Sequence, residues 1–168
     1  QQYILRSSAT DIATNVQASI SSAAFTYDIF AATAALTIPV TNALGPVLGN
    51  IAGTATDATA GVSYVKLAIS SGAGLGSWYD GAVFTGGSPT FFTTTTYIPG
   101  ASDIWTWAYP TLVDGQAYTL RARTLDKAGN QRDQNFNFRF DSSSPTATLA
   151  IPVDGGFRTG NFAITGAS

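Results

Sequence analysis

Two neighbouring stretches decide the fold: Gln116-Ala-Tyr-Thr-Leu-Arg-Ala-Arg-Thr124 and, after a polar turn, Asn135-Phe-Asn-Phe-Arg-Phe140. In both, apolar and polar side chains alternate residue by residue, which is the period of a strand with one buried face. Between them lies Asp126-Lys-Ala-Gly-Asn130, and we expect Gly129 to adopt the left-handed conformation that a tight turn requires. The pattern predicts a β-hairpin whose apolar residues face a core.

Other strand-like segments surround this hairpin. We expect strands at residues 34–39, 48–55, 63–70, 78–84, 91–97 and 103–109. About seven short strands separated by frequent turn signals are typical of an immunoglobulin-like β-sandwich. Asp114 stands four residues before Tyr118, the arrangement of a tyrosine corner, in which the hydroxyl ties a crossover to the sandwich. Leu120 takes the position where an antibody-type domain has Cys, so apolar packing must replace the disulfide.

The composition favours strands and excludes several functions. All ten acidic residues are Asp, and Lys occurs only as Lys66 and Lys127, whereas Glu and Lys are common in helices. A net charge of −2 offers no electrostatic footprint for nucleic acid, and no apolar run approaches the roughly 20 residues of a membrane span. Because His and Cys are absent, a Ser-His-Asp triad and a Cys nucleophile are excluded, and we expect no enzyme.

An internal repeat organises the chain, because residues near the N-terminus recur in the same order 115 or 113 residues later. The matched segments are Tyr3-Ile-Leu-Arg6 with Tyr118-Thr-Leu-Arg121, Asp11 with Asp126, Asn15 with Asn130, Phe25-Thr-Tyr27-Asp28 with Phe138-Arg-Phe140-Asp141, Leu36-Thr-Ile38-Pro39-Val40 with Leu149-Ala-Ile151-Pro152-Val153, and Ile51-Ala-Gly53 with Ile164-Thr-Gly166. This period is too long for a solenoid repeat and suits an immunoglobulin-like domain of about 100 residues.

The repeat predicts one complete unit flanked by two partial ones. The complete unit spans residues 31–142, residues 1–30 supply the last two strands (F and G) of a preceding unit, and residues 143–168 supply the first two strands (A and B) of a following unit. Isolated hairpins are marginal in water, so we expect both ends to contact other protein. Either the chain is a window of a longer polypeptide, or its ends pair with neighbouring copies by strand addition.

Several motifs in a fixed order resemble the bacterial Ig-like repeats of very large secreted and surface proteins. They are Gly53-Thr-Ala-Thr-Asp57, Gly61-Val-Ser-Tyr-Val65, Trp78-Tyr-Asp-Gly81, Asp114-Gly-Gln-Ala-Tyr118, Asp126-Lys-Ala-Gly-Asn130, and Phe140-Asp141 followed by Pro145. The resemblance covers the complete unit and both partial ones. It implies arrays of similar domains in adhesins, surface layers and extracellular filaments, and it implies no reaction.

The sequence suggests calcium as a cofactor. Asp57, Asp126, Asn130 and Asp141 lie in predicted loops or at the end of the last strand, near the presumed junction between units. Carboxylate, amide and carbonyl oxygens are the ligands of this cation, and calcium there would stiffen a row of domains. In the alternative interpretation, these aspartates cap local turns.

Aromatic residues give the second set of candidates. Trp105, Trp107 and Tyr109 share one face of a predicted strand, where they form either core, the interpretation we favour, or a sugar-stacking platform. Trp78 and Tyr79 stand beside a turn, and because adjacent strand residues face opposite ways, one ring is expected to be available for contact, for example with a surface glycan.

We therefore expect a rigid extracellular repeat that builds a filament, stalk or sheath together with neighbouring copies. The lack of Cys and Met suits a long-lived secreted protein, since oxidation has little to attack. An adhesive or carbohydrate-binding module is the alternative, which an exposed aromatic patch rimmed by polar groups would favour. An accessory domain of an enzyme is a third class, and it requires a catalytic domain elsewhere in the polypeptide.

Overall fold

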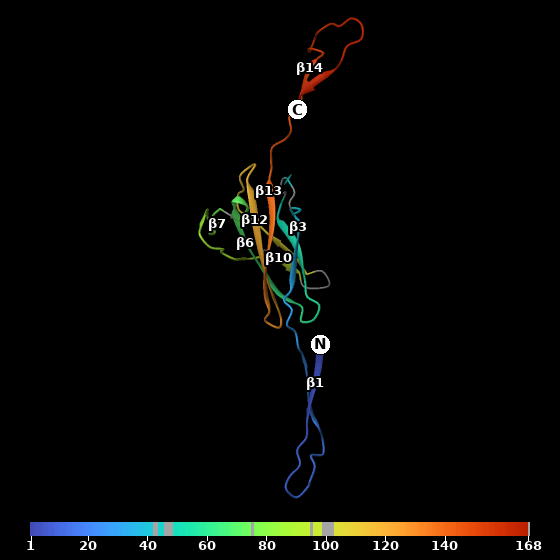
Figure 1. The fold of residues 1–168 in the computed structure, drawn as a ribbon, viewed down its shortest axis with the longest axis vertical. Coiled ribbons are helices and arrows are strands. Elements are labelled where there is room, and N and C mark those ends of the chain that lie inside the picture. Colours follow the sequence, from blue (N-terminus) through green and yellow to red (C-terminus); the bar gives the residue numbers. More distant parts are fainter. Residues whose placement is uncertain (42–43, 46–48, 75, 95, 99–102, 168) are drawn as a thin grey trace.

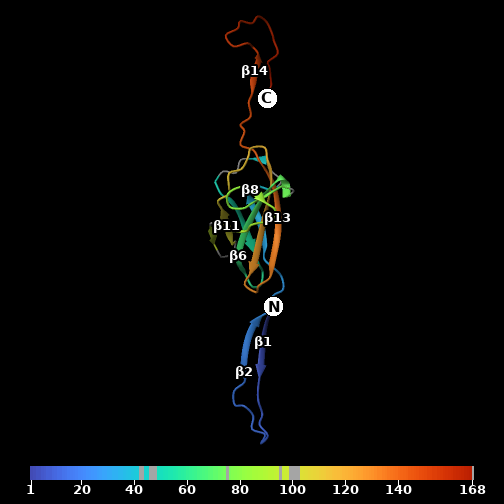
Figure 2. The ribbon, with the colours of Figure 1, turned by 90° about the vertical axis from the view of Figure 1, so that its left-hand side faces the viewer.

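The chain folds into a central body with a two-stranded hairpin extending from each end (Figures 1 and 2). The computed structural model describes residues 1–41, 44–45, 49–74, 76–94, 96–98 and 103–167. The elements are β1 (Gln2–Ser7), β2 (Ser21–Thr26), β3 (Thr33–Ile38), β4 (Leu44–Gly45), β5 (Ile51–Thr56), β6 (Val62–Ser71), the 3₁₀ turn η1 (Gly72–Gly74), β7 (Trp78–Tyr79), β8 (Phe84–Gly86), β9 (Phe92–Thr93), β10 (Thr96–Ile98), β11 (Ile104–Trp107), β12 (Ala117–Asp126), β13 (Gln131–Phe140), β14 (Thr148–Ile151) and β15 (Thr165–Ala167). Within these ranges the chain has no helix long and apolar enough to cross a bilayer.

The central body is a β-sandwich made of two sheets. One sheet has the antiparallel order β10-β11-β5-β3. The other has the order β4-β13-β12-β6-β7-β8, with β9 also paired to β6. The strands of this second sheet pair antiparallel, except that β4 runs parallel to β13. The all-β class predicted from the sequence is therefore confirmed.

A single cluster of buried side chains joins the two sheets. β5 and β11 of the first sheet and β6, β12 and β13 of the second contribute inward-facing residues at alternate positions, as strands with one buried face must. The members from these strands are Ile51, Ala55, Trp105, Trp107, Val62, Val65, Leu67, Ile69, Tyr118, Leu120, Ala122 and Phe138. Full burial of one large apolar side chain stabilises a fold by about 1.5–3 kcal/mol, so this cluster carries the sandwich without a disulfide.

The hairpin β1–β2 has the same strand register as β12–β13. Tyr3 lies opposite Phe25 in the first, and Tyr118 lies opposite Phe138 in the second. The two ring pairs are stacked alike, with centroids 5.5 Å and 5.8 Å apart and interplanar angles of 20° and 26°. The residues that the sequence repeat aligns are therefore also paired alike in space.

The hairpin β14–β15 likewise has the register of β3–β5. Leu36 faces Gly53, and Leu149 faces Gly166. In both hairpins the register then shifts before the next isoleucine, Ile38 or Ile151. The difference is one of environment, because β3–β5 forms one side of the sandwich core whereas the side chains of β14–β15 are largely exposed.

Two predicted strands are interrupted. The continuous strand expected at residues 78–84 is split into β7 and β8 by a turn at Asp80, whose Oδ1 accepts the backbone N–H groups of Ala82 and Val83, both at 2.9 Å. The strand expected at 91–97 is split into β9, which pairs with β6, and β10, which pairs with β11. This segment passes from one sheet to the other, a path set by tertiary pairing and not by the local pattern.

Candidate functional site

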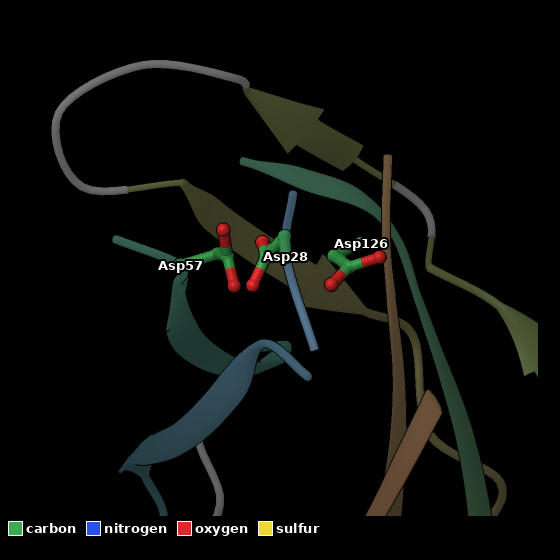
Figure 3. A group of neighbouring side chains, drawn as sticks. All are labelled: Asp28, Asp57 and Asp126. Atoms are coloured by element: carbon green, nitrogen blue, oxygen red, sulfur yellow. The ribbon is translucent and has the colours of Figure 1, made fainter. Parts of the chain in front are cut away.

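The candidate site is the junction where the segment between β2 and β3 enters the sandwich. Three aspartates from distant parts of the chain meet there, as Figure 3 shows: Asp28 from the entering segment, Asp57 from the loop after β5, and Asp126 from the end of β12. Each offers a carboxylate oxygen, and these three oxygens all lie within 4.8 Å of one another. The sequence separates Asp28 from Asp126 by most of the chain, so only the fold brings them together.

Asp57 organises the loop between β5 and β6. Its Oδ1 accepts three successive backbone N–H groups, those of Thr59, Ala60 and Gly61, at 3.0, 2.8 and 2.7 Å. Such side-chain caps satisfy backbone donors that a tight loop leaves unpaired. Gly61 has a φ of +80°, a conformation that glycine adopts without a steric penalty, and the loop can therefore turn sharply under the carboxylate.

Asp126 and Asn130 close the turn between β12 and β13. The backbone N–H and the side-chain amide of Asn130 donate to Oδ1 and Oδ2 of Asp126, both at 2.8 Å. Gly129, at φ +94°, is in the left-handed region, as the sequence predicted for this turn. Asp126 is only 1% exposed, and this burial acts to raise its pKa, but the hydrogen bonds from Asn130 and neighbouring backbone outweigh it and leave the pKa below its ordinary value.

Asp28 attaches the entering segment to both of these loops. Its Oδ2 accepts the backbone N–H of Ala60 at 3.0 Å, and its backbone carbonyl accepts the side-chain amide of Asn130 at 3.1 Å. Its other carboxylate oxygen accepts the N–H of Phe30 at 3.1 Å. Asn130 therefore bridges Asp126 and Asp28, and the hydrogen bonds fix the segment that joins the β1–β2 hairpin to the sandwich.

The three carboxylates are the described groups that could hold a hard cation such as Ca²⁺, which takes oxygen ligands. Among the described residues, the ion pair is between Arg123 and Asp133, at 2.7 Å and away from this junction. The hydrogen bonds given above for the three carboxylates come from neutral N–H donors, and the side chain of Lys127 lies beside Gly61. Calcium binding by Asp57, Asp126 and Asn130 stays a prediction, and the structure adds Asp28 to the group.

The structure does not bring Asp141 to this junction. Asp141 follows β13 at the opposite end of the β12–β13 hairpin from Asp126, because the two strands run antiparallel over their whole length. Its Oδ1 accepts the N–H of Ser143 at 3.0 Å. Asp28 aligns with Asp141 in the sequence repeat, so the repeat could have identified Asp28: the junction uses the earlier copy of this residue.

Asp114 fixes the chain where it leaves the sandwich at that opposite end. Its carboxylate accepts the backbone N–H and the hydroxyl of Ser142 and the hydroxyl of Ser143. The bond from the Ser143 hydroxyl, followed by those from Ser142, lowers the pKa of Asp114 to about 2. The Tyr118 hydroxyl accepts the backbone N–H of Val113 at 2.8 Å, so it bonds to the backbone of the crossover that precedes β12.

The predicted structural aromatics lie in the core, and the predicted contact aromatics are covered. Trp105 and Trp107 are buried, as is Leu120. Trp78 is only 8% exposed, because the Arg121 guanidinium lies over its ring at 4.8 Å from the centroid. Tyr79 faces the other way and packs against Phe84 and Phe92 at centroid distances of 5.3 and 5.6 Å. Trp78 is therefore buried, and Tyr79 is half-buried.

The comparisons with known proteins assign the chain to no family. No protein-family model matches the sequence, and no curated protein matches it at a significant level. The function must therefore be argued from the junction and from the repeated hairpins.

Proposed function

We propose that this chain is a structural extracellular repeat, an immunoglobulin-like module that builds a surface filament, stalk or sheath from units joined end to end. The observation that carries the proposal is the repeated register. The hairpin before the sandwich pairs its residues as β12–β13 does, and the hairpin after it pairs its residues as β3–β5 does. The preceding hairpin thus has the form of the end of a unit, and the following hairpin has the form of the beginning of one.

The sheet orders support the immunoglobulin-like assignment. In immunoglobulin-like domains the first, second, fourth and fifth strands form one sheet, and the third, sixth and seventh form the other. The order β10-β11-β5-β3 corresponds to strands D, E, B and A, and the neighbours β13, β12 and β6 correspond to G, F and C. The hydrogen bond between the Tyr118 hydroxyl and the backbone before β12 is also a feature of this class.

The two ends of the sandwich support a load-bearing role. Asp28 and Asn130 hold the entering segment at one end, and Asp114 holds the leaving segment at the other. Because these bonds connect the linkers to rigid turns, bending at the junctions is restricted. A module whose function is to keep a fixed direction between neighbours requires such attachments at both ends.

The alternative function, an adhesive or carbohydrate-binding module, has less support. Of the two rings that the sequence offered for contact, Trp78 is buried under Arg121, and Tyr79 is half-buried against Phe84 and Phe92. A sugar that stacks on a ring needs one open aromatic face. The open rings of Tyr3 and Phe25 lie on the β1–β2 hairpin, a partial unit that we expect to contact other protein, so they do not by themselves favour a sugar.

Immunogold labelling of intact cells that make the protein tests the structural proposal. Antibodies against the folded protein should label filaments, a stalk or a sheath outside the cell envelope, and cells lacking the gene are the control. Label that reaches the protein only after the cells are permeabilised would contradict an extracellular structural role. Label spread over the surface of a bound host cell or particle, with no filament or sheath, would favour the adhesive alternative.

A further inference from the structure

The hairpin β1–β2 has an uncovered apolar face. Tyr3 is 41% exposed, Leu5 66% and Phe25 52%. These residues lie on one face of the hairpin, because alternate residues of a strand point the same way and opposite residues share a face. Large apolar side chains gathered in this way mark a contact surface.

The matching residues of β12–β13 are buried. Leu120, which aligns with Leu5, has no exposed surface, and Tyr118 and Phe138 are exposed by only 1% and 3%. The other sheet covers this face, since its Ile51, Trp105 and Trp107 belong to the same core cluster. β6 extends the face sideways, because it pairs along β12 with Leu120 opposite its Ile69 and Ala122 opposite its Leu67. Val65, Leu67 and Ile69 of β6 are themselves buried in the core, so a strand with alternating apolar residues flanks this face in the sandwich, and β1 has no such neighbour in the described part of the chain.

The backbone of β1 offers the edge that such a strand would need. Gln1 and Tyr27 exchange hydrogen bonds across the hairpin at 2.9 Å. In an antiparallel pair such bonded residues alternate with unbonded ones, so the peptide groups of Ile4 and Arg6 point away from β2. In β12 the aligned residues are Thr119 and Arg121, which stand opposite Ser70 and Ala68 of β6. In the described part of the chain, β1 pairs with β2 alone.

We propose that β1 binds an antiparallel β-strand with apolar residues at alternate positions, which pairs along its free edge and packs its apolar side chains beside Tyr3 and Leu5, so that the apolar face of the hairpin becomes wider. The occupant has the chemistry of β6, with a residue like Ile69 opposite Leu5. Main-chain hydrogen bonds supply affinity in such strand addition, and alternate side chains supply selectivity. The inference rests on the hairpin's own surface and edge, and it holds whether or not the chain builds a filament.

The test uses the full chain, ¹⁵N-labelled, and a synthetic peptide with the sequence of residues 61–72 extended by a lysine tail for solubility. Addition of the peptide should shift the amide resonances of Ile4, Leu5 and Arg6 and slow their hydrogen exchange. The matched peptide control has Ser in place of the residues corresponding to Val65, Leu67 and Ile69. It keeps the backbone donors and acceptors but loses the apolar face, so it should bind at least about tenfold more weakly.

Two variants of the protein separate edge pairing from simple apolar contact. Ile4→Pro removes an N–H that points to the free edge, and proline is tolerated in edge strands at such positions, so binding should fall about tenfold or more. Ala24→Pro is the matched control, because its N–H points to the opposite edge of the same hairpin, and it should bind as the parent does. Leu5→Asn should also weaken binding, whereas Arg6→Asn, on the other face, should not.

Three results would overturn the proposal. The first is the absence of any binding of the peptide with the 61–72 sequence. The second is equal binding by the Ile4→Pro variant and the parent. The third is self-association of the chain, measured by analytical ultracentrifugation, that Leu5→Asn abolishes and Ile4→Pro leaves intact, because the hairpin would then bind a second copy through its apolar face and not through a strand paired at its edge. Each result bears on the hairpin alone and leaves the labelling test of the structural role independent.

Discussion

The hairpins β12–β13 and β1–β2 share their turn and their register but not their surroundings. Asn15 bonds to Asp11 through its backbone and side chain at 2.8 and 2.9 Å, as Asn130 bonds to Asp126. Yet Leu120 is fully buried, while its counterpart Leu5 is 66% exposed. The shape of the hairpin is thus determined locally by turn chemistry and by cross-strand pairs, whereas its stability within the sandwich comes from the strands that cover it.

The hairpins β3–β5 and β14–β15 repeat the same contrast. Gly53 and Gly166 each lie where an added Cβ would overlap a backbone carbonyl oxygen of the facing strand, that of Ala35 or of Thr148. At Gly53 an added Cβ would also overlap the ring of Trp105. The two strands therefore approach closely in both hairpins. Among the described residues, a tryptophan ring covers Gly53 but not Gly166.

The largest expected difference between the copies concerns their leucines. Leu120→Ala should lower the free energy of unfolding by about 3 kcal/mol, because it removes a fully buried side chain and leaves a cavity. Leu5→Ala should change it by less than about 0.5 kcal/mol, since the side chain already meets solvent. Urea denaturation followed by tryptophan fluorescence measures both. Equal losses would mean that the β1–β2 hairpin is covered in solution.

The glycines give the next largest difference. Gly53→Ala should cost about 2 kcal/mol, because the new methyl group overlaps the Trp105 ring and the carbonyl oxygen of Ala35. Gly166→Ala should distort β14–β15 without moving the main unfolding transition, since that hairpin lies outside the core cluster. The same denaturation curves report both variants. A shift of the main transition by Gly166→Ala would show that the final hairpin packs on the sandwich.

The tyrosines give a smaller difference. Tyr118→Phe should cost about 1 kcal/mol, since it removes the acceptor of the Val113 N–H. Tyr3→Phe should change stability by less than about 0.5 kcal/mol, because its hydroxyl makes a long, exposed contact of 3.5 Å with the Gln1 side chain. Thermal unfolding of the two variants provides the comparison. If Tyr118→Phe leaves the stability unchanged, the hydrogen bond from Val113 to the Tyr118 hydroxyl does not stabilise the crossover.

The smallest expected effect concerns the segment that follows β13. Asp114 holds Ser142 and Ser143 after β13, and its pKa of about 2 lies below the ordinary 3.8. A carboxylate with a depressed pKa adds stability that is present above pH 3.8 and is lost as the pH falls toward 2. The amide resonance of Ser142 should therefore titrate with a midpoint near pH 2, and Asp114→Asn should abolish this titration. A midpoint near 4 would contradict the hydrogen bonds.

The sequence predicted the elements with a strong local signal. The alternation in β12 and β13 and the turn at Gly129 were predictable, because strand period and left-handed glycine are properties of short segments. The splitting of residues 78–84 into β7 and β8, and of residues 91–97 into β9 and β10, could not be predicted, since it depends on which strand lies beside each segment. The covering of Trp78 by Arg121 has the same origin, as it involves a neighbour across the sheet.

The junction shows the same limit. The sequence groups Asp57, Asp126 and Asn130 with Asp141 by their positions at strand ends, and the structure places Asp28, not Asp141, beside the first three. The two residues are equivalent in the repeat, and only the direction of β13 decides which end of the sandwich each one occupies. A repeat found in a sequence identifies equivalent residues, and the three-dimensional pairing is needed to decide which copy acts at a given site.

The most direct test of the central claim, that the flanking hairpins are the end and the beginning of neighbouring units, is duplication of residues 29–141 in tandem within the chain. This insertion adds one full unit and places Asp141 where Asp28 stands in the parent. Scanning calorimetry should give about twice the unfolding enthalpy of the parent sandwich, because enthalpy scales with folded length. An unchanged enthalpy, with the inserted copy digested as unfolded chain, would contradict the account.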